Sequence, residues 1–127
     1  MIQINKDNIH ELDNLCCDAE AEELYVKDIL DVLTLEQIYS TIQHILKKVA
    51  RGGMCTFCFI DLWSVCSMYV NQKITDKDVN EILHSNGNNV TLSLKTLLEI
   101  IKTIKGFKKI KQNSVGYQSS VTLERIK

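Results

Sequence analysis

The chain has 127 residues, of which 45% are hydrophobic and 24% charged, and its formal net charge is −1. These values are typical of one soluble globular domain, so we expect residues 1–127 to form a single unit, with residues 1–12 as an N-terminal extension. The charge balance gives no electrostatic reason to expect nucleic acid as a partner. No apolar run approaches the ~20 residues of a membrane-spanning helix, and the acidic N-terminus argues against a signal peptide. We therefore expect no membrane contact and a cytoplasmic location.

The five cysteines are irregularly spaced and odd in number, which argues against a disulfide framework and favours a reducing compartment. Cys55 and Cys58 form a CxxC motif within an apolar run that predicts a buried strand. Side chains three residues apart in a strand point to opposite faces, so this pair cannot share a metal ion. The three histidines have no metal-ligand spacing either, and we predict no metal site.

Near the N-terminus, two short runs are predicted as strands, at residues 13–18 and at Glu23–Val26. The run Met1–Ile4 alternates as an added strand would. Thr34 and Gln37 then have the spacing of a capping box, which predicts the start of a helix that continues to about residue 49. The glycine pair at positions 52–53 is expected to end this helix, and the apolar run that follows predicts a buried strand as far as residue 60.

Downstream, the apolar spacing from Leu62 to Tyr69 predicts a helix, and Thr75 caps a second, shorter one. Residues 86–89 read as a loop, and Leu94–Ile104 as an amphipathic helix. Two final runs, at residues 107–111 and 117–123, predict an antiparallel hairpin at a sheet edge. We expect the core to contain eight apolar side chains from the helices and the central strand: Ile38, Ile42, Ile45, Phe57, Phe59, Leu97, Leu98 and Ile101.

Lysines recur at positions 102, 105, 108, 109 and 111. Alternating lysines along a strand are typical of a solvated face, and aromatic residues are too sparse among them for a nucleic-acid platform. This stretch therefore predicts no nucleic-acid binding.

Several segments, in this order, resemble class I, Rossmann-like methyltransferases of the type 11-like group, which use S-adenosylmethionine (SAM). Residues 23–33 are similar to the family pattern ashvLEHl, and residues 49–62 are similar to vLkpGGrl.i..pDl. Gly106 and Phe107 resemble the GF that opens a later strand. The resemblance covers residues 13–125. It implies an α/β fold with a mixed sheet, a terminal antiparallel hairpin and helices on the faces of the sheet.

The chain departs from this pattern at the cofactor site. The resemblance implies that SAM is held by a glycine-rich loop after the first strand and an acidic residue closing the second. Neither has a counterpart here, and residues 1–12 contain no glycine. We therefore expect a truncated domain that resembles the second half of the fold. It should bind no cofactor, and SAM only if a partner completes the site.

The resemblance leaves four candidate cofactor-binding residues. Asp18 and Ala19 resemble an Asp-Ala pair that follows the third strand and recognises adenine. Asp28 lies in the loop after the fourth strand, and Asp61 follows the fifth. Each aspartate also has an ordinary structural interpretation, because a carboxylate at the end of a strand often caps the next turn or helix. No catalytic residue is predicted.

Three classes of function stay open. The first is a methyltransferase-like module without catalysis, acting as a binding, structural or accessory unit through association with itself or with another protein. The second is a SAM-dependent methyltransferase completed by a second chain. The third is an unrelated small enzyme that uses Asp18, Asp28 and Asp61. Low proline with abundant Ile, Lys and Asn is typical of an AT-rich genome and suggests a phage or viral origin, in which case the location could be the virion.

The resemblance also predicts an association site. In the family fold, the strand equivalent to Glu23–Val26 pairs on one side with a strand that this chain lacks. A free edge there has unpaired N–H and C=O groups, which seek a partner. We expect either residues 13–18 to pair with it or a homo-oligomer or another protein to bind through it.

Overall fold

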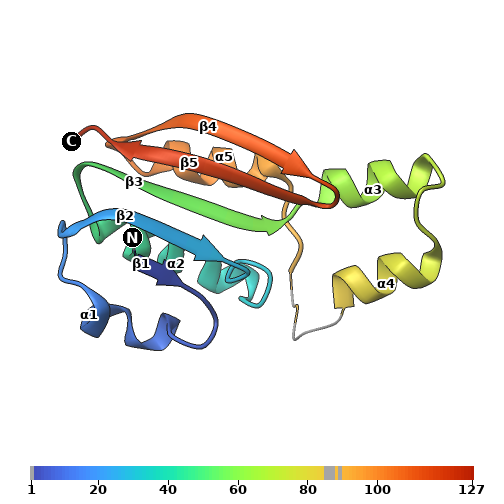
Figure 1. The fold of residues 1–127 in the computed structure, drawn as a ribbon, viewed down its shortest axis with the longest axis horizontal. Helices are drawn as coiled ribbons and strands as arrows, with labels where there is room; N and C mark the ends of the chain where they lie inside the picture. The colour runs from blue at the N-terminus through green and yellow to red at the C-terminus, as the bar shows by residue number, and fades with distance from the viewer. Residues whose placement is uncertain (1, 85–87, 89) are drawn as a thin grey trace.

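The computed structural model describes residues 2–84, 88 and 90–127 (Figure 1). Its elements follow one another along the chain as β1 (Ile2–Ile4), the 3-10 helix η1 (Ile9–Glu11), α1 (Leu12–Leu15), β2 (Ala21–Lys27), α2 (Leu35–Lys47), β3 (Val49–Ile60), α3 (Leu62–Val70), α4 (Asp76–His84), α5 (Leu94–Thr103), β4 (Phe107–Val115) and β5 (Gln118–Arg125).

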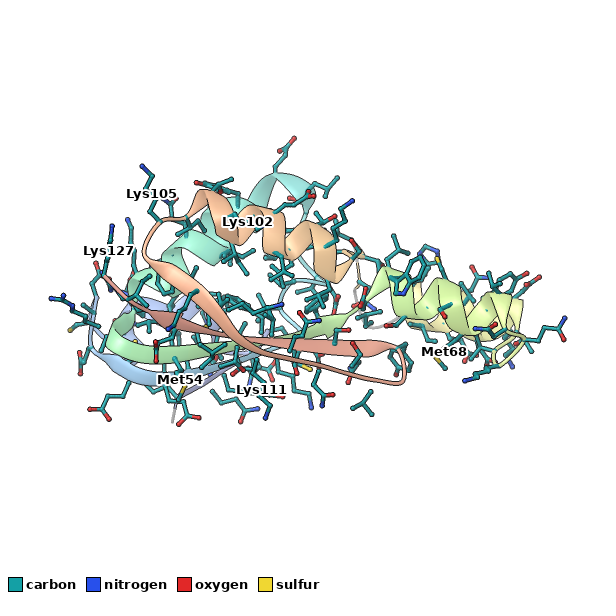
Figure 2. The ribbon with its side chains drawn as sticks, turned by 90° about the horizontal axis from the view of Figure 1, so that it is seen from above. Met54, Met68, Lys102, Lys105, Lys111 and Lys127 are labelled. Carbon is teal, nitrogen blue, oxygen red and sulfur yellow. The ribbon has the colours of Figure 1, made fainter. Side chains whose placement is uncertain are left out.

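The five strands form one mixed sheet in the order β1-β2-β3-β5-β4. The strands β1, β2 and β3 run parallel, whereas β5 is antiparallel to both β3 and β4. The predicted α/β class, with a mixed sheet and a terminal antiparallel hairpin, is therefore confirmed. The two longest helices, α2 and α5, lie on the same face of this sheet (Figure 2).

The helix α2 forms because its sequence carries both a start signal and an apolar stripe. Thr34 and Gln37 make the predicted capping box. Ile38, Ile42 and Ile45 then recur along one side of the helix and are fully buried against the sheet. Of the eight predicted core residues, seven are buried, and Leu98 is half-buried at the margin of the core.

Residues 13–18, predicted as a strand, include the end of helix α1. The prediction was wrong because the buried residues of this segment follow a helical spacing. Leu12 and Cys16 are four residues apart and both face the core, and the amide of Cys16 donates to the Leu12 carbonyl at 3.4 Å. The intervening residues are exposed.

The edge expected to be free at residues 23–26 is paired in this structure. Strand β1 pairs in parallel with residues 24–26 of β2, so the N-terminal run supplies the added strand. Residues 2–12, expected as an extension, thus belong to the sheet and its core, since Ile4 and Leu12 are buried. The helices η1 and α1 lie at this edge (Figure 1).

The glycine pair at positions 52–53 lies inside β3 rather than in a turn that ends α2. The register between β2 and β3 shifts between Ala21 and Glu23, opposite these glycines. Gly52 has φ +81°, and a Cβ on Gly53 would lie 2.9 Å from three carbonyl oxygens. Both positions therefore need glycine, to make a bulge in a continuous strand.

Helices α3 and α4 form an arm that projects from the carboxyl end of β3 (Figure 1). Asp61 and Thr75 precede the two helices, and α4 contains no buried residue. Of the predicted loop at 86–89, residues 86, 87 and 89 lie outside the described residues. Within the described chain, no helix is long and apolar enough to cross a membrane.

Candidate functional site

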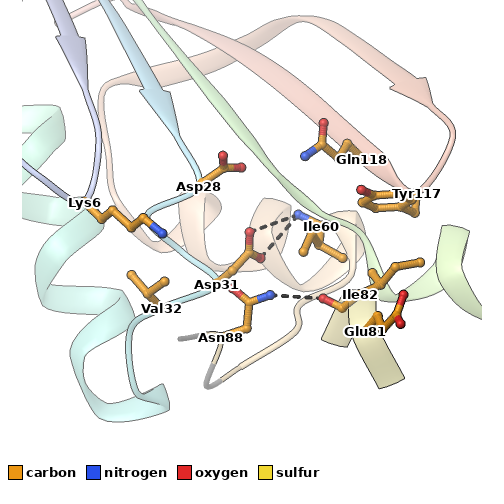
Figure 3. Close-up of a pocket in the computed structure, with 10 residues that line it drawn as sticks. All are labelled: Lys6, Asp28, Asp31, Val32, Ile60, Glu81, Ile82, Asn88, Tyr117 and Gln118. Carbon is orange, nitrogen blue, oxygen red and sulfur yellow. Dashed lines mark hydrogen bonds between the residues drawn. The ribbon is translucent and has the colours of Figure 1, made fainter. Parts of the chain in front are cut away.

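A pocket of about 350 Å³ lies where the parallel strands β2 and β3 end (Figure 3). In open α/β sheets, ligands bind in crevices outside the carboxyl ends of the strands, so this is the expected position for a site. The pocket is lined by residues from six segments of the chain: Lys6, Asp28, Asp31, Val32, Ile60, Glu81, Ile82, Asn88, Tyr117 and Gln118.

Asp28 enters the pocket from the turn that follows β2. Its backbone is in the left-handed region, with φ +59°, and its amide donates to the carbonyl of Cys58 at 3.1 Å. Aspartate tolerates this conformation better than most residues, although at some cost. From this turn Asp28 lines the pocket.

Asp31 is the most deeply buried acidic group of the pocket, with only 3% of its surface exposed. Both of its oxygens accept from the amide of Ile60, at 3.3 Å (Figure 3). Burial raises the pKa of Asp31 to about 6, and the nearby charge of Asp28 adds to this rise, while the bond from Ile60 opposes it. The carboxyl group of Asp31 therefore keeps its proton to a higher pH than an ordinary aspartate does.

Lys6, Glu81, Asn88, Tyr117 and Gln118 complete the polar lining. The ammonium group of Lys6 points toward Asp28 and Asp31 in Figure 3, but no ion pair within 4 Å joins it to either in the described chain. Glu81 pairs with Lys77 at 3.9 Å, so Asp28 and Asp31 are the two carboxylates that lie near Lys6. The arrangement suits a small polar ligand with a cationic or hydrogen-bond-donating group.

Asp61 lies at the same end of the sheet but has a structural role. It is 3% exposed and begins α3, where its carboxylate accepts from the amide of Trp63 at 3.1 Å. The same group accepts from the hydroxyl of Ser119 at 2.7 Å and from the amide of Leu94 at 3.3 Å. Asp61 therefore ties the starts of α3 and α5 to strand β5, and its carboxylate does not line the pocket.

Asp18 and Ala19 lie at the opposite end of β2. Because residues 13–18 do not form a strand, this pair does not follow one, and it leads into the amino end of β2 instead. Asp18 Oδ1 accepts from Lys48 Nζ at 2.8 Å, and Ala19 has φ +58°. A strand of seven residues is roughly 23 Å long, so the pair is far from the pocket.

The structure thus places Asp28 in the pocket, puts Asp61 beside it in a scaffold, and separates Asp18 and Ala19 from both. Sequence reasoning missed Asp31 and Lys6 as members of the site. The available signal for Asp31 was an acidic residue directly after the apolar pair Ile29 and Leu30, both of which are buried. Lys6 had no such signal, because its place depends on β1 pairing with β2.

Cys55 and Cys58 lie on opposite faces of β3, as predicted. Cys55 is buried in the core, and Cys58 is half-buried on the other face. Burial raises the pKa of both thiols. The described residues contain no cluster of three or more potential metal ligands.

No protein-family model and no curated protein matches the chain. Solved structures do match it. A SAM-dependent methyltransferase from Archaeoglobus fulgidus is 11% identical with a TM-score of 0.61, and the match covers 94% of this chain and 66% of that one. An O-methyltransferase family protein from Burkholderia thailandensis is 13% identical with a TM-score of 0.61, and the match covers 84% of this chain and 31% of that one. Magnesium protoporphyrin IX methyltransferase from Synechocystis PCC 6803, solved with bound SAH, is 13% identical with a TM-score of 0.59. That match covers 84% of this chain and 46% of that one.

The chain has a methyltransferase-like fold. At 11–13% identity the likeness is one of fold, and it confirms the Rossmann-like architecture that the sequence motifs implied. The chain spans 31% to 66% of the length of these three structures. In a methyltransferase-like fold the pocket at the carboxyl ends of β2 and β3 is the natural candidate for a ligand site.

Proposed function

We propose that this chain acts by binding, as an accessory or structural methyltransferase-like module, and does not transfer methyl groups by itself. The observation that carries the proposal is the lining of the pocket. Among the residues that the structure describes, no glycine lines it, and the five glycines of the sequence all lie at position 52 or later. A close approach of backbone N–H groups to a cofactor needs such residues. The amide of Ile60 is already bonded to Asp31.

The residues present do not form a SAM site by themselves. Asp18, which the resemblance assigned to adenine, is bonded to Lys48 at the other end of β2. Asp61 is saturated by the groups that it holds in place. Only Asp28 of the four candidates faces the pocket, and one contact cannot offset the several kcal/mol that ordering a ligand costs.

Calorimetric titration with SAM and with SAH tests the proposal, using the full chain. We expect no measurable heat of binding at cofactor concentrations up to the millimolar range. The variant Asp28→Asn serves as the matched control, since it removes the one candidate charge in the pocket. Micromolar affinity that Asp28→Asn abolishes would overturn the proposal, and so would methyl transfer by the isolated chain.

A second candidate is a SAM-dependent methyltransferase completed by another chain. It is supported by the share of each neighbouring structure that this chain covers, which leaves a third or more of their length unmatched. Co-expression with the protein encoded beside it would test this candidate. Binding of SAM by the purified complex, but by neither chain alone, is the expected result, and a complex without SAM affinity would exclude it.

A further inference from the structure

One face of the sheet carries no helix in the described part of the chain. Figure 2 shows α2 and α5 on the same side, whereas Met54 and Lys111 point to the other side. Strands of a parallel sheet are normally covered on both faces, because their side chains alternate between two buried layers. Here β1, β2 and β3 are parallel but covered on one face only.

The strand register defines this bare face. Residues directly opposite each other in neighbouring strands share a face, and Tyr25, Thr56 and Thr122 form its central row. The hydroxyl groups of Thr56 and Thr122 lie 2.9 Å apart, and all three side chains are half-buried. The bare face consists of Gln3, Glu23, Tyr25, Lys27, Met54, Thr56, Cys58, Ile60, Lys108, Lys111, Asn113, Val115, Gln118, Ser120, Thr122 and Glu124.

Two charges on this face, those of Glu23 and Lys27, are arranged for self-complementarity. Glu23 and Lys27 lie on β2, two residues to either side of Tyr25 and on the same face. Both are exposed, and neither forms an ion pair with any residue that the structure describes. By contrast, Lys108 and Glu124 on the same face already pair with each other, at 3.5 Å. Glu23 and Lys27 are thus a negative and a positive group without an ion-pair partner in the described part of the chain.

A two-fold axis that runs across the strands at the level of Tyr25 satisfies both charges. This rotation lays the bare faces of two copies against each other and reverses the strand direction. Glu23 of each copy then faces Lys27 of the other, while Tyr25, Thr56 and Thr122 meet their counterparts at the axis. Lys111, at the β4 end of the same row, also meets its counterpart there, and the two Glu23–Lys27 pairs have to outweigh that repulsion. Sheets packed face to face lie about 10 Å apart with aligned strands, a spacing that side chains of this size fill.

We propose that the bare face binds a second copy of this chain, sheet against sheet, through two Glu23–Lys27 ion pairs. This inference rests on the proposed function as a binding module, and it names the surface and the partner. The occupant is a second copy because Glu23 and Lys27 of one copy match Lys27 and Glu23 of the other, as an isologous two-fold interface requires.

The test is the mass of the full chain in solution, measured by light scattering, together with charge reversals. The monomer mass is 14.5 kDa, and we expect twice this value for the native chain at high micromolar concentration. Glu23→Lys and Lys27→Glu each place like charges opposite each other and should weaken dimerisation roughly tenfold or more. The double variant E23K/K27E exchanges the charges within one chain, restores both pairs and should restore the dimer.

Glu99→Lys is the matched control, because Glu99 is exposed on α5 in the opposite layer and undergoes the same change of charge. Circular dichroism of each variant checks that it is folded. A monomeric native chain would overturn the inference, as would a dimer that neither single reversal weakens. The proposed function fails on a different result, SAM binding or methyl transfer by the isolated chain, so the two failures are distinguishable.

Discussion

The two ends of the parallel strands both carry clustered carboxylates, but the pKa of a carboxyl group is lowered at one end and raised at the other. At the amino end, Lys48 Nζ lies 2.6 Å from Asp13 and 2.8 Å from Asp18, and His44 lies 2.9 Å from Asp13. The hydrogen bonds from Lys48 and His44 lower the pKa of Asp13 to about 2. At the carboxyl end, burial instead raises the pKa of Asp31 to about 6.

This difference separates structural charges from candidate functional ones. The amino-end carboxylates are held by Lys48, whose side chain is 4% exposed, and they join α1 to the end of α2. Among the described residues no cation pairs with Asp31, and its burial costs stability at neutral pH. A group kept in an unfavourable environment beside a pocket is a better candidate for ligand contact than one that is fully paired.

The largest expected effect comes from removing the scaffold of the carboxyl end. Asp61→Ala leaves the amides of Trp63 and Leu94 and the hydroxyl of Ser119 without their acceptor. Loss of a helix cap and of buried hydrogen bonds should lower the free energy of unfolding by about 3 kcal/mol. Urea denaturation measures this loss. Ser64→Ala, which removes only a 3.4 Å bond to the same carboxylate, is the control and should change stability little.

A somewhat smaller effect is expected at the amino end. Lys48→Ala leaves Asp13 and Asp18 without their common partner, and we expect the melting temperature to fall by several degrees. Lys47→Ala, at the exposed neighbouring lysine, should leave it nearly unchanged. Equal melting temperatures for the two variants would show that the ion pairs at this end do not stabilise the fold.

The sequence predicted the elements with strong local signals. The capping box at Thr34, the stripe of α2 and the terminal hairpin are local patterns, and the structure confirms them. It could not predict that residues 2–4 add a strand beside β2, because pairing between distant segments leaves no local pattern. Lys6 was missed for the same reason, because its place depends on β1 pairing with β2. Asp31 did follow the buried pair Ile29 and Leu30, but its bond to the amide of Ile60 depends on β3 packing next to β2.

The stability of the chain should depend on pH through Asp31. Because the folded pKa of Asp31 lies above its ordinary value of 3.8, the folded chain holds a proton between pH 4 and 6 that the unfolded chain has lost. Asp31 therefore contributes a stability that is present at about pH 4 and is lost as the pH rises through about 6. A shift of about two pKa units corresponds to at most about 3 kcal/mol.

Asp31→Asn removes this titration. As the pH rises from 4 to 7, the native chain loses up to about 3 kcal/mol of unfolding free energy through Asp31, whereas the variant does not. The difference in unfolding free energy between variant and native chain should therefore shift by that amount in favour of the variant. Asp13→Asn is the counterpart at the amino end, and its sign is opposite. The lowered pKa of Asp13 gives a contribution that is present above pH 4 and is lost as the pH falls toward 2. Parallel pH profiles for native chain and Asp31→Asn would contradict the assignment.

The smallest expected effect is at Asp28, whose charge raises the pKa of Asp31 as a secondary cause after burial. Asp28→Asn keeps the size of the side chain and suits the left-handed backbone at φ +59°, so stability should change by less than about 0.5 kcal/mol. The pKa of Asp31, followed by carboxyl-carbon NMR, should fall by a fraction of a unit, because the repulsion is removed while the burial remains. Asp28→Gly should lower it equally, since the cause is the charge and not the shape of the turn. If neither variant moves the pKa of Asp31, the charge of Asp28 does not act on Asp31. The two carboxylates then do not form one site for a polar ligand.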